Sequence, residues 1–263
     1  MQMPEITIEL KNLTTGYTSK SNKRVVSKDL TACLNNGELT CLLGVNGAGK
    51  STLLRTLSAF IPPLSGKILF LGKYLEEYTP KELSKLIGVV LTGRMEQGGL
   101  TVFDMVGMGR SPYTGFWGTL REPDKEIVKD AIRQIKIMHL TERTMDTLSD
   151  GERQKVMIAK ALAQETPVIF LDEPTAFLDF PSKVEIMQML QSLAHDMKKT
   201  IFLSTHDLEL ALQVADKLWL LDAEHLITGT PKDLAQQGYL DRFFNIPGII
   251  FDKENLTYKI ARK

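Results

Sequence analysis

The sequence predicts an α/β fold with a parallel sheet, and three observations support this prediction. Short apolar runs of about five residues recur along the chain and alternate with segments of helical periodicity. One run leads into a glycine-rich pattern at residues 44–51, and a helical segment follows it. Another run ends in two adjacent acids, Asp172 and Glu173. Open α/β sheets typically present polar residues in this way, at the carboxyl ends of their strands.

The N-terminal part of the chain predicts strands on both sides of a turn. Residues 6–10 alternate with period two, as a half-buried strand does, and residues 25–34 continue a strand-like pattern. The Asn-Asn-Gly sequence at residues 35–37 predicts a turn. The sequence predicts a buried strand at residues 39–43 and a helix at residues 51–57, so the glycine-rich pattern is expected to lie between the two.

Two more apolar runs, residues 67–72 and 87–91, predict further strands. Between them, Thr79 precedes Pro80, and proline in the first turn is a helix-start signal. The strand pattern resumes later in the chain and closes with a predicted hairpin. These later strands cover residues 168–171, 200–204 and 217–221, and the hairpin pairs residues 249–251 with 256–258.

Residues 92–163 lack the alternation of strand and helix patterns that the rest of the chain has. Glycines and Pro112 mark loops, and residues 124–137 have a strong helical period. That period places five apolar residues on one side of the helix: Ile127, Val128, Ala131, Ile132 and Ile135. This part of the chain is a candidate inserted helical subdomain.

Composition limits the classes of protein that fit. The chain has 263 residues, enough for one large α/β domain or a core with an inserted subdomain. Its 32 basic and 32 acidic residues cancel, which argues against nucleic acid as the main partner. Cys33 and Cys41 have no metal-site spacing. No signal sequence or apolar run of about 20 residues is found, so we expect a cytoplasmic protein.

Residues 44–51 have the form GxxxxGKS, a phosphate-binding loop. Glycines let successive backbone N–H groups point inward, and the following helix presents its positive dipole end to phosphates. Lys50 can reach the β and γ phosphates, and the Ser51 hydroxyl can ligate Mg²⁺. The predicted nucleotide-binding residues are Gly44, Asn46, Gly47, Ala48, Gly49, Lys50, Ser51 and Thr52. The alternative is a glycine-rich turn beside a solvated lysine, which the strand and helix around it disfavour.

The apolar strand at residues 168–171 delivers Asp172 and Glu173 at its carboxyl end. Asp172 is suited to hold Mg²⁺ through water, complementing Ser51. Glu173 is suited to polarise the water that attacks the γ phosphate. The alternative reading of these residues is an ordinary acidic turn that caps a helix.

Four motifs in this order resemble the ABC-transporter ATPase family, and the resemblance covers nearly the whole chain. They are the phosphate loop, Leu-Ser-Asp-Gly-Glu at residues 148–152, the Asp172-Glu173 strand and Ser-Thr-His-Asp at residues 204–207. The family signature near LSGGQ stands shortly before the second acidic strand, as LSDGE does here. The resemblance implies a P-loop NTPase (RecA-like) core with an antiparallel β subdomain and an inserted α-helical subdomain.

The resemblance also implies that the chain is a single ABC ATPase domain made of a core, a helical subdomain and a C-terminal extension. Residues 1–91 and 162–232 would form the nucleotide-binding core, and residues 92–161 the helical subdomain with the signature. Residues 233–263 would be a C-terminal extension.

Further site residues follow from the resemblance. Tyr17 would stack on the adenine of ATP, and His206 would contact the γ phosphate and sense its loss. Asp179 would lie on the loop that joins two active sites. Ser149 and the Gly151 N–H would bind the ATP held by a second copy of the chain. Without the resemblance, Tyr17 reads as a surface tyrosine and residues 148–152 as a loop that caps the next helix.

Three departures from the family pattern matter. Asp150 replaces a glycine, and we expect its side chain to point away from the nucleotide or to cap the next helix. Thr92 stands where a glutamine usually ends its strand and is a candidate metal ligand, whereas Gln97 could substitute only in a rearranged loop. Phe177 precedes Asp179 where small residues are commoner, and we interpret it as a packing residue.

Residues 101–115 resemble the importer branch for iron-siderophores, haem and cobalamin, through a GRxPY-type loop at residues 109–113. In that family the helical insert receives a short helix of a membrane permease. The candidate groove residues are Phe103, Met105, Met108, Tyr113, Phe116 and Trp117, and the alternative for each is core packing.

The implied protein is an ATP-hydrolysing subunit that acts with permease subunits, a second copy of itself and, indirectly, a substrate-binding protein. It would lie at the inner face of the cell membrane, held there by the permease, with ATP and Mg²⁺ as cofactors and no nucleic acid. The alternatives are a soluble ABC ATPase in cofactor or iron–sulfur assembly and a nucleic-acid-linked ABC ATPase. A nucleotide switch without turnover is another, if Thr92 and Asp150 disable the site.

Overall fold

The computed structural model describes residues 5–19, 22–91, 99–115, 118–222, 225–243 and 249–260. The chain divides into two compact units. The first comprises residues 1–77 and 190–263, and the second comprises residues 78–189. Among the described residues, no helix combines the length and the apolar character needed to cross a membrane.

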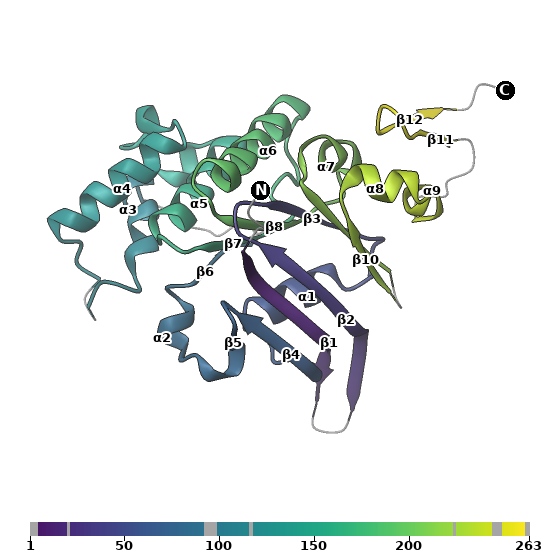
Figure 1. The fold of residues 1–263 in the computed structure, drawn as a ribbon. Helices are drawn as coiled ribbons and strands as arrows, with labels where there is room; N and C mark the ends of the chain where they lie inside the picture. The colour runs from purple at the N-terminus through teal and green to yellow at the C-terminus, as the bar shows by residue number, and fades with distance from the viewer. Residues whose placement is uncertain are drawn as a thin grey trace. The chain divides into compact units, whose positions relative to one another are not determined.

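The first unit contains an antiparallel sheet in the order β2-β1-β4-β5 (Figure 1). Its strands are β1 (Ile6–Thr18), β2 (Lys23–Asn35), β4 (Ser65–Phe70) and β5 (Lys73–Tyr74), followed by the short helix η1 (Leu75–Glu77). Both N-terminal strands are longer than predicted, because register shifts along β1 let pairing continue past each irregularity. The extension places Tyr17 in β1, opposite Arg24 of β2.

The same unit contains a set of buried strands around β3. β3 (Leu39–Leu43) pairs in parallel with β8 (Thr200–Ser204) and with β9 (Lys217–Leu221). β10 (Leu226–Gly229) pairs antiparallel with β9. All residues of β3 and β8 are buried, which explains their continuous apolar sequences. The three parallel strands match the predicted ranges to the residue.

Among its described residues, the first unit also contains four short helices, a hairpin and the last residues of α6 (Phe180–His195). The helices are α1 (Lys50–Leu57), α7 (Leu208–Val214), α8 (Pro231–Gln236) and α9 (Tyr239–Phe243). β11 (Ile249–Asp252) and β12 (Thr257–Ile260) form the predicted hairpin, each strand slightly longer than expected. The Asp252 carboxylate accepts hydrogen bonds from backbone N–H groups of the turn, which fixes the turn.

The second unit combines two parallel strands with helices. β6 (Ile87–Val90) pairs with β7 (Val168–Asp172). The helices are α2 (Pro80–Leu83), α3 (Val102–Gly107), η2 (Met108–Arg110), α4 (Glu122–Gln134), η3 (Met138–Leu140), η4 (Met145–Thr147) and α5 (Asp150–Ala163). α6 (Phe180–His195) begins in this unit and ends in the first.

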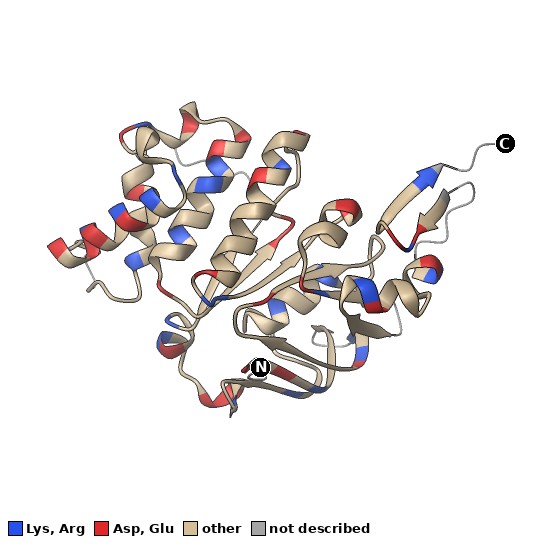
Figure 2. Cartoon of the chain, turned by 45° about the horizontal axis from the view of Figure 1, so that its top comes forward, with Lys and Arg blue, Asp and Glu red and all other residues tan. Residues whose placement is uncertain are grey.

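Helices α3, α4 and α5 contact one another and form the helical part of the second unit (Figure 1). The predicted helix at residues 124–137 is α4, which starts two residues earlier and ends at Gln134. It ends there because Lys136 adopts a left-handed conformation, with φ of 60°. On the exposed side of α4, acidic residues pair with basic residues three positions later, and both signs of charge alternate along the helix (Figure 2).

Candidate functional site

The phosphate-loop sequence forms a tight turn between β3 and α1, as predicted. Gly47 and Gly49 have φ of 82° and 102°, backbone angles that residues with a Cβ rarely adopt. The Ala48 N–H donates to the Val45 carbonyl over 3.1 Å, which closes the turn. Gly49 is the N-cap of α1, and no side chain caps the helix there. An N-terminus without a side-chain cap is the arrangement that binds anions.

At two positions of this loop, neighbouring atoms leave no room for a Cβ, so glycine is required there. A Cβ on Gly44 would lie 2.6 Å from the carbonyl oxygen of Leu221. A Cβ on Gly49 would lie 2.5 Å from Val26 Cγ1 and 3.0 Å from Ser27 Oγ. The strand β2 therefore supports the loop from one side. The sequence carried no signal for this contact, because it depends on packing between distant segments.

Lys50 turns back onto the loop. Its Nζ donates to the Gly44 carbonyl over 2.8 Å and to the Val45 carbonyl over 3.4 Å. The lysine is 6% exposed, whereas Ser51 and Asn46 are exposed. Lys50 thus places a buried positive charge beside a loop whose residues 45–47 are exposed to solvent.

Tyr17 and Thr52 meet at the edge of this loop. The Tyr17 hydroxyl and Thr52 Oγ1 lie 3.1 Å apart, within hydrogen-bond distance. Tyr17 is 42% exposed, so part of its ring remains open to solvent. The structure therefore brings the predicted adenine-stacking residue beside the first turn of α1.

His206 follows β8 at the sheet edge from which the phosphate loop leaves. β3 and β8 are parallel, with Leu42 opposite Ser204, so both end on the same side. The Thr205 N–H donates to the Leu42 carbonyl over 3.1 Å, which holds the segment before His206 against β3. His206 is exposed.

In the second unit, Asp172 is the last residue of β7 and is 8% exposed. Glu173 follows with φ of 46°, a left-handed conformation that costs energy for a residue with a Cβ. The Ala176 N–H donates to the Glu173 carbonyl over 3.0 Å and forms a turn. The buried strand therefore ends in the two acids, as predicted, with backbone strain at the second.

Ser149 caps α5 through a reciprocal capping box with Glu152. The Ser149 N–H and hydroxyl donate to Glu152 Oε2 over 2.8 and 2.9 Å, and the Glu152 N–H donates to Ser149 Oγ over 3.3 Å. The backbone N–H of Ser149 in particular holds the pKa of Glu152 below its usual value. Of the two residues that could cap this helix, Ser149 is the one that does so. The Asp150 carboxylate accepts a hydrogen bond from Arg153 over 3.2 Å.

Ser182 connects Gly151 with Asp179. A Cβ on Gly151 would lie 3.2 Å from Ser182 Oγ. The Ser182 N–H donates to Asp179 Oδ1 over 3.2 Å, and the Ser182 hydroxyl chiefly lowers the pKa of Asp179. The N-terminal ends of α5 and α6 therefore meet here. Sequence reasoning missed Ser182, although a residue three positions after an aspartate at a helix start is a recognisable capping signal.

Some expectations are corrected by the structure. Phe177 does not pack within the chain: it is 94% exposed and has φ of 64°. Met105 is fully buried, so it belongs to the core and not to a groove. Met108 and Tyr113 are exposed and Phe103 is half-buried. Other expected positions lie outside the described residues, namely Thr92, Gln97, Phe116 and Trp117.

Comparison with known proteins matches this arrangement to one family. A family model described as ABC transporter matches residues 27–176, more than half of the chain. An uncharacterised ABC transporter ATP-binding protein of Methanocaldococcus jannaschii is 40% identical, over 91% of this chain and 81% of its own. The ferric enterobactin transport ATP-binding protein of Escherichia coli is 34% identical, over 91% and 88%. The iron(3+)-hydroxamate import ATP-binding protein of Bacillus subtilis is 33% identical, over 91% of both.

Solved structures show the same fold. An ABC transporter assigned to the metal-chelate type, in an inward-facing conformation, superposes with a TM-score of 0.80 at 28% identity, over 97% of this chain and 96% of that one. A dimeric bacterial ABC transporter cassette superposes with a TM-score of 0.71 at 26% identity, over 85% and 98%. The predicted fold class, a P-loop ATPase core with antiparallel and helical parts, is confirmed.

Proposed function

Because the chain belongs to the ABC transporter family of ATP-binding proteins, we propose that it energises an importer for iron-siderophore, haem or cobalamin-type substrates. ABC ATP-binding proteins hydrolyse ATP to power transport. The observation that carries the proposal is the likeness, over 91% of the chain, to proteins that transport ferric enterobactin and iron(3+)-hydroxamates. This likeness favours transport over the alternative of a soluble ATPase in cofactor or iron–sulfur assembly.

ATP would bind at the phosphate loop. The uncapped N-terminus of α1 and the buried ammonium of Lys50 would hold the phosphates, and Tyr17 would stack on the adenine. The tight glycine turn supports this role, since it exposes backbone N–H groups to an anion.

Mg²⁺ fits the oxygen donors that the chain offers. Ser51 and Asp172 would hold the ion, with Thr92 a further candidate, and the ion would neutralise phosphate charge during hydrolysis. The described residues contain no group of three or more histidines, cysteines or acids that could hold a metal. Proteins usually bind magnesium through one or two carboxylates together with phosphate oxygens.

Hydrolysis would depend on residues from two copies of the chain. Glu173 would polarise the attacking water, and His206 would contact the γ phosphate. Ser149 and Gly151 of the second copy would complete the site, and Asp179 would lie between the two sites. ATP then favours the closed dimer, because only that state makes both sets of contacts. The dimeric cassette of similar fold supports this arrangement.

The partners would be integral membrane permease subunits, a second copy of the chain and, indirectly, a substrate-binding protein. The permease would hold the chain at the inner face of the membrane and would convert closing and opening of the dimer into alternating access. The exposed Met108 and Tyr113 are the described residues that best fit a docking surface for a permease helix.

Replacement of the proposed catalytic carboxylate tests this mechanism. Glu173→Gln should retain ATP binding, lose at least about tenfold in steady-state hydrolysis, and accumulate as a dimer with ATP and Mg²⁺ in light scattering. The matched control, Glu126→Gln, changes an exposed acid of α4 and should behave as the wild type. Hydrolysis by Glu173→Gln at the wild-type rate would remove Glu173 from the mechanism.

Transport itself requires the complex. The permease that copurifies with the tagged chain should be reconstituted in liposomes and tested with ferric siderophores, haem and cobalamin. ATP-dependent uptake of one of these would support the proposal. ATP hydrolysis that neither a permease nor these cargoes stimulate would favour the soluble-ATPase alternative.

A further inference from the structure

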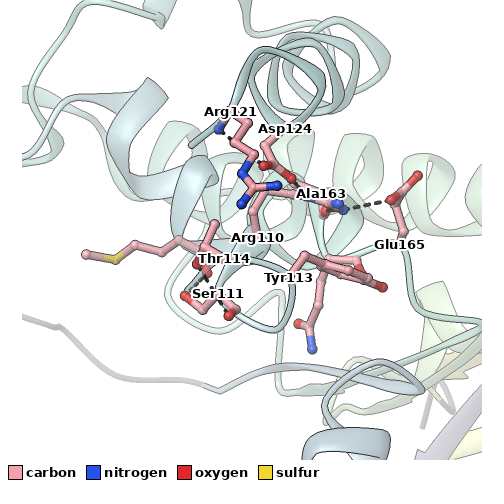
Figure 3. Close-up of polar contacts among 10 residues, drawn as sticks. Arg110, Ser111, Tyr113, Thr114, Arg121, Asp124, Ala163 and Glu165 are labelled. Carbon is pink, nitrogen blue, oxygen red and sulfur yellow. Dashed lines mark hydrogen bonds and ion pairs between the residues drawn. The ribbon is translucent and has the colours of Figure 1, made fainter. Parts of the chain in front are cut away.

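Arg110 is a buried charge in the GRxPY-type loop of the second unit, and it contacts two helix ends. The arginine is 4% exposed. Its Nε donates to Asp124 Oδ1 over 3.1 Å, and its Nη1 donates to the Ala163 carbonyl over 2.8 Å and to Glu165 Oε2 over 2.7 Å (Figure 3). Asp124 belongs to the first turn of α4, and Ala163 is the last residue of α5. The guanidinium therefore joins the start of one helix to the end of the next.

Tyr113 extends the same contact to the surface. Its ring lies 4.1 Å from Arg110 Cζ, which places the guanidinium against the aromatic face (Figure 3). The Tyr113 hydroxyl donates to the Gln164 carbonyl over 3.1 Å, and burial raises the pKa of that hydroxyl. Arg110 and Tyr113 thus satisfy two consecutive carbonyls at the C-terminal end of α5, where a helix leaves its carbonyls without partners.

Gly109 permits this close approach. A Cβ at that position would lie 2.2 Å from the Lys160 carbonyl oxygen and 3.3 Å from Ala163 Cβ. The first of these distances is too short for any L side chain. The loop backbone therefore rests directly on the last turn of α5.

The other end of α5 carries the signature residues. Ser149 is the N-cap of the helix, whose 14 residues span about 21 Å. α5 is one continuous helix, so a rigid shift of its C-terminal end would also move Ser149. The exposed Tyr113 contacts Arg110 and the Gln164 carbonyl, which places it beside this C-terminal end, and the exposed Met108 lies in η2 with Arg110.

We propose that Arg110 is a positioning residue that ties the permease-docking loop to α5, so that docking at Met108 and Tyr113 shifts Ser149 relative to the ATP of the partner subunit. The proposal rests on the proposed transport function. Arg110 itself is buried, so its side chain would act through its neighbours and not by contacting the permease or the nucleotide. Its removal should therefore uncouple hydrolysis from the permease without abolishing hydrolysis.

The test compares three variants with a matched control, each as free protein and as the complex reconstituted with its permease. Arg110→Met removes the charge, and Arg110→Lys keeps it but lacks the planar fork that reaches three acceptors at once. Gly109→Ala separates the loop from α5 by steric contact alone. The control, Arg133→Met, removes an exposed arginine of α4 that pairs with Asp130, one turn earlier in the helix.

We expect Arg110→Met and Gly109→Ala to hydrolyse ATP as the free wild-type protein does, and to lose about tenfold of the stimulation that the permease gives. Arg110→Lys should retain part of the stimulation by the permease, and Arg133→Met should retain all of it. Hydrogen exchange supplies a second readout: assembly with the permease should change protection at residues 149–153 in the wild type but not in Arg110→Met. If Arg110 had a purely structural role, the permease would still change protection at residues 149–153 in Arg110→Met.

The outcomes separate the two proposals. A wild-type complex without permease-dependent hydrolysis would overturn the proposed function. A stimulated wild-type complex together with full stimulation in Arg110→Met and Gly109→Ala would overturn the role of Arg110 alone. If circular dichroism shows that Arg110→Met does not fold, Gly109→Ala and Glu165→Gln decide the question, since Glu165 is an exposed partner of the guanidinium.

Discussion

The ammonium of Lys50 donates a hydrogen bond to the carbonyl oxygen of Gly44 over 2.8 Å, so the phosphate loop is closed by its own lysine. A nucleotide would compete with that carbonyl for the same charge. Lys50→Met should weaken ATP binding about 10- to 100-fold, the effect of losing one or two charge-assisted hydrogen bonds. Isothermal titration with ATP and Mg²⁺ measures this. Lys129→Met, which removes a partly exposed lysine paired with Glu126, is the control; equal affinity in both variants would contradict the prediction.

The Tyr17 ring and its hydroxyl can be tested separately. Tyr17→Ala should weaken ATP binding about tenfold, because stacking on a base contributes about 1–3 kcal/mol. Tyr17→Phe keeps the ring and loses only the contact with Thr52, so its affinity should fall by about two- to threefold at most. Inorganic tripolyphosphate has no base and should bind both variants equally. A loss in Tyr17→Phe as large as that in Tyr17→Ala would assign the role to the hydroxyl.

Phe177 has a strained backbone conformation and an exposed side chain, so we predict that its replacement by glycine stabilises the protein. The residue has φ of 64° and is 94% exposed, so Phe177→Gly removes a conformational cost and almost no packing. We expect the free energy of unfolding to rise by about 1 kcal/mol in urea denaturation. The control is Phe180→Gly, also exposed but in the first turn of α6, where glycine should lower stability by a similar amount. A loss of stability in both variants would contradict the argument.

Sequence alone predicted the buried strands best. β3, β8 and β9 match to the residue, since each is a continuous apolar run bounded by turn residues. The loop glycines were predicted with their reason, because GxxxxGKS requires a tight backbone. The bond from Lys50 to Gly44 could not be predicted, since it depends on how the loop closes.

The role of Arg110 was equally hidden. An arginine after a glycine reads as a loop residue, and its partners Asp124, Ala163 and Glu165 lie 14 to 55 positions away. Met105 was placed in a groove for a related reason. α3 has six residues, too few for its period to show which face is buried.

The capping box at the start of α5 should make stability depend on pH. The Ser149 backbone N–H lowers the pKa of Glu152, so the folded state favours the ionised carboxylate. The resulting stabilisation is fully present above the unfolded pKa, near 4.5, and is lost as the pH falls through the lower folded pKa. Glu152→Gln keeps a side chain that can accept the same hydrogen bond but removes the charge.

The difference in free energy of unfolding between wild type and Glu152→Gln should therefore be about 0.5 kcal/mol at pH 7, in favour of the wild type, as expected for a charge in the first turn of a helix. It should shrink as the pH is lowered through 4. Urea denaturation of both proteins between pH 7 and pH 3.5, followed by circular dichroism, measures it. The neutral glutamine has no ionisation at this position, so the pH-dependent part of the difference belongs to the Glu152 carboxylate. A difference that grew on acidification would mean that the folded state favours the protonated acid, contrary to the hydrogen bonds that Ser149 donates to it.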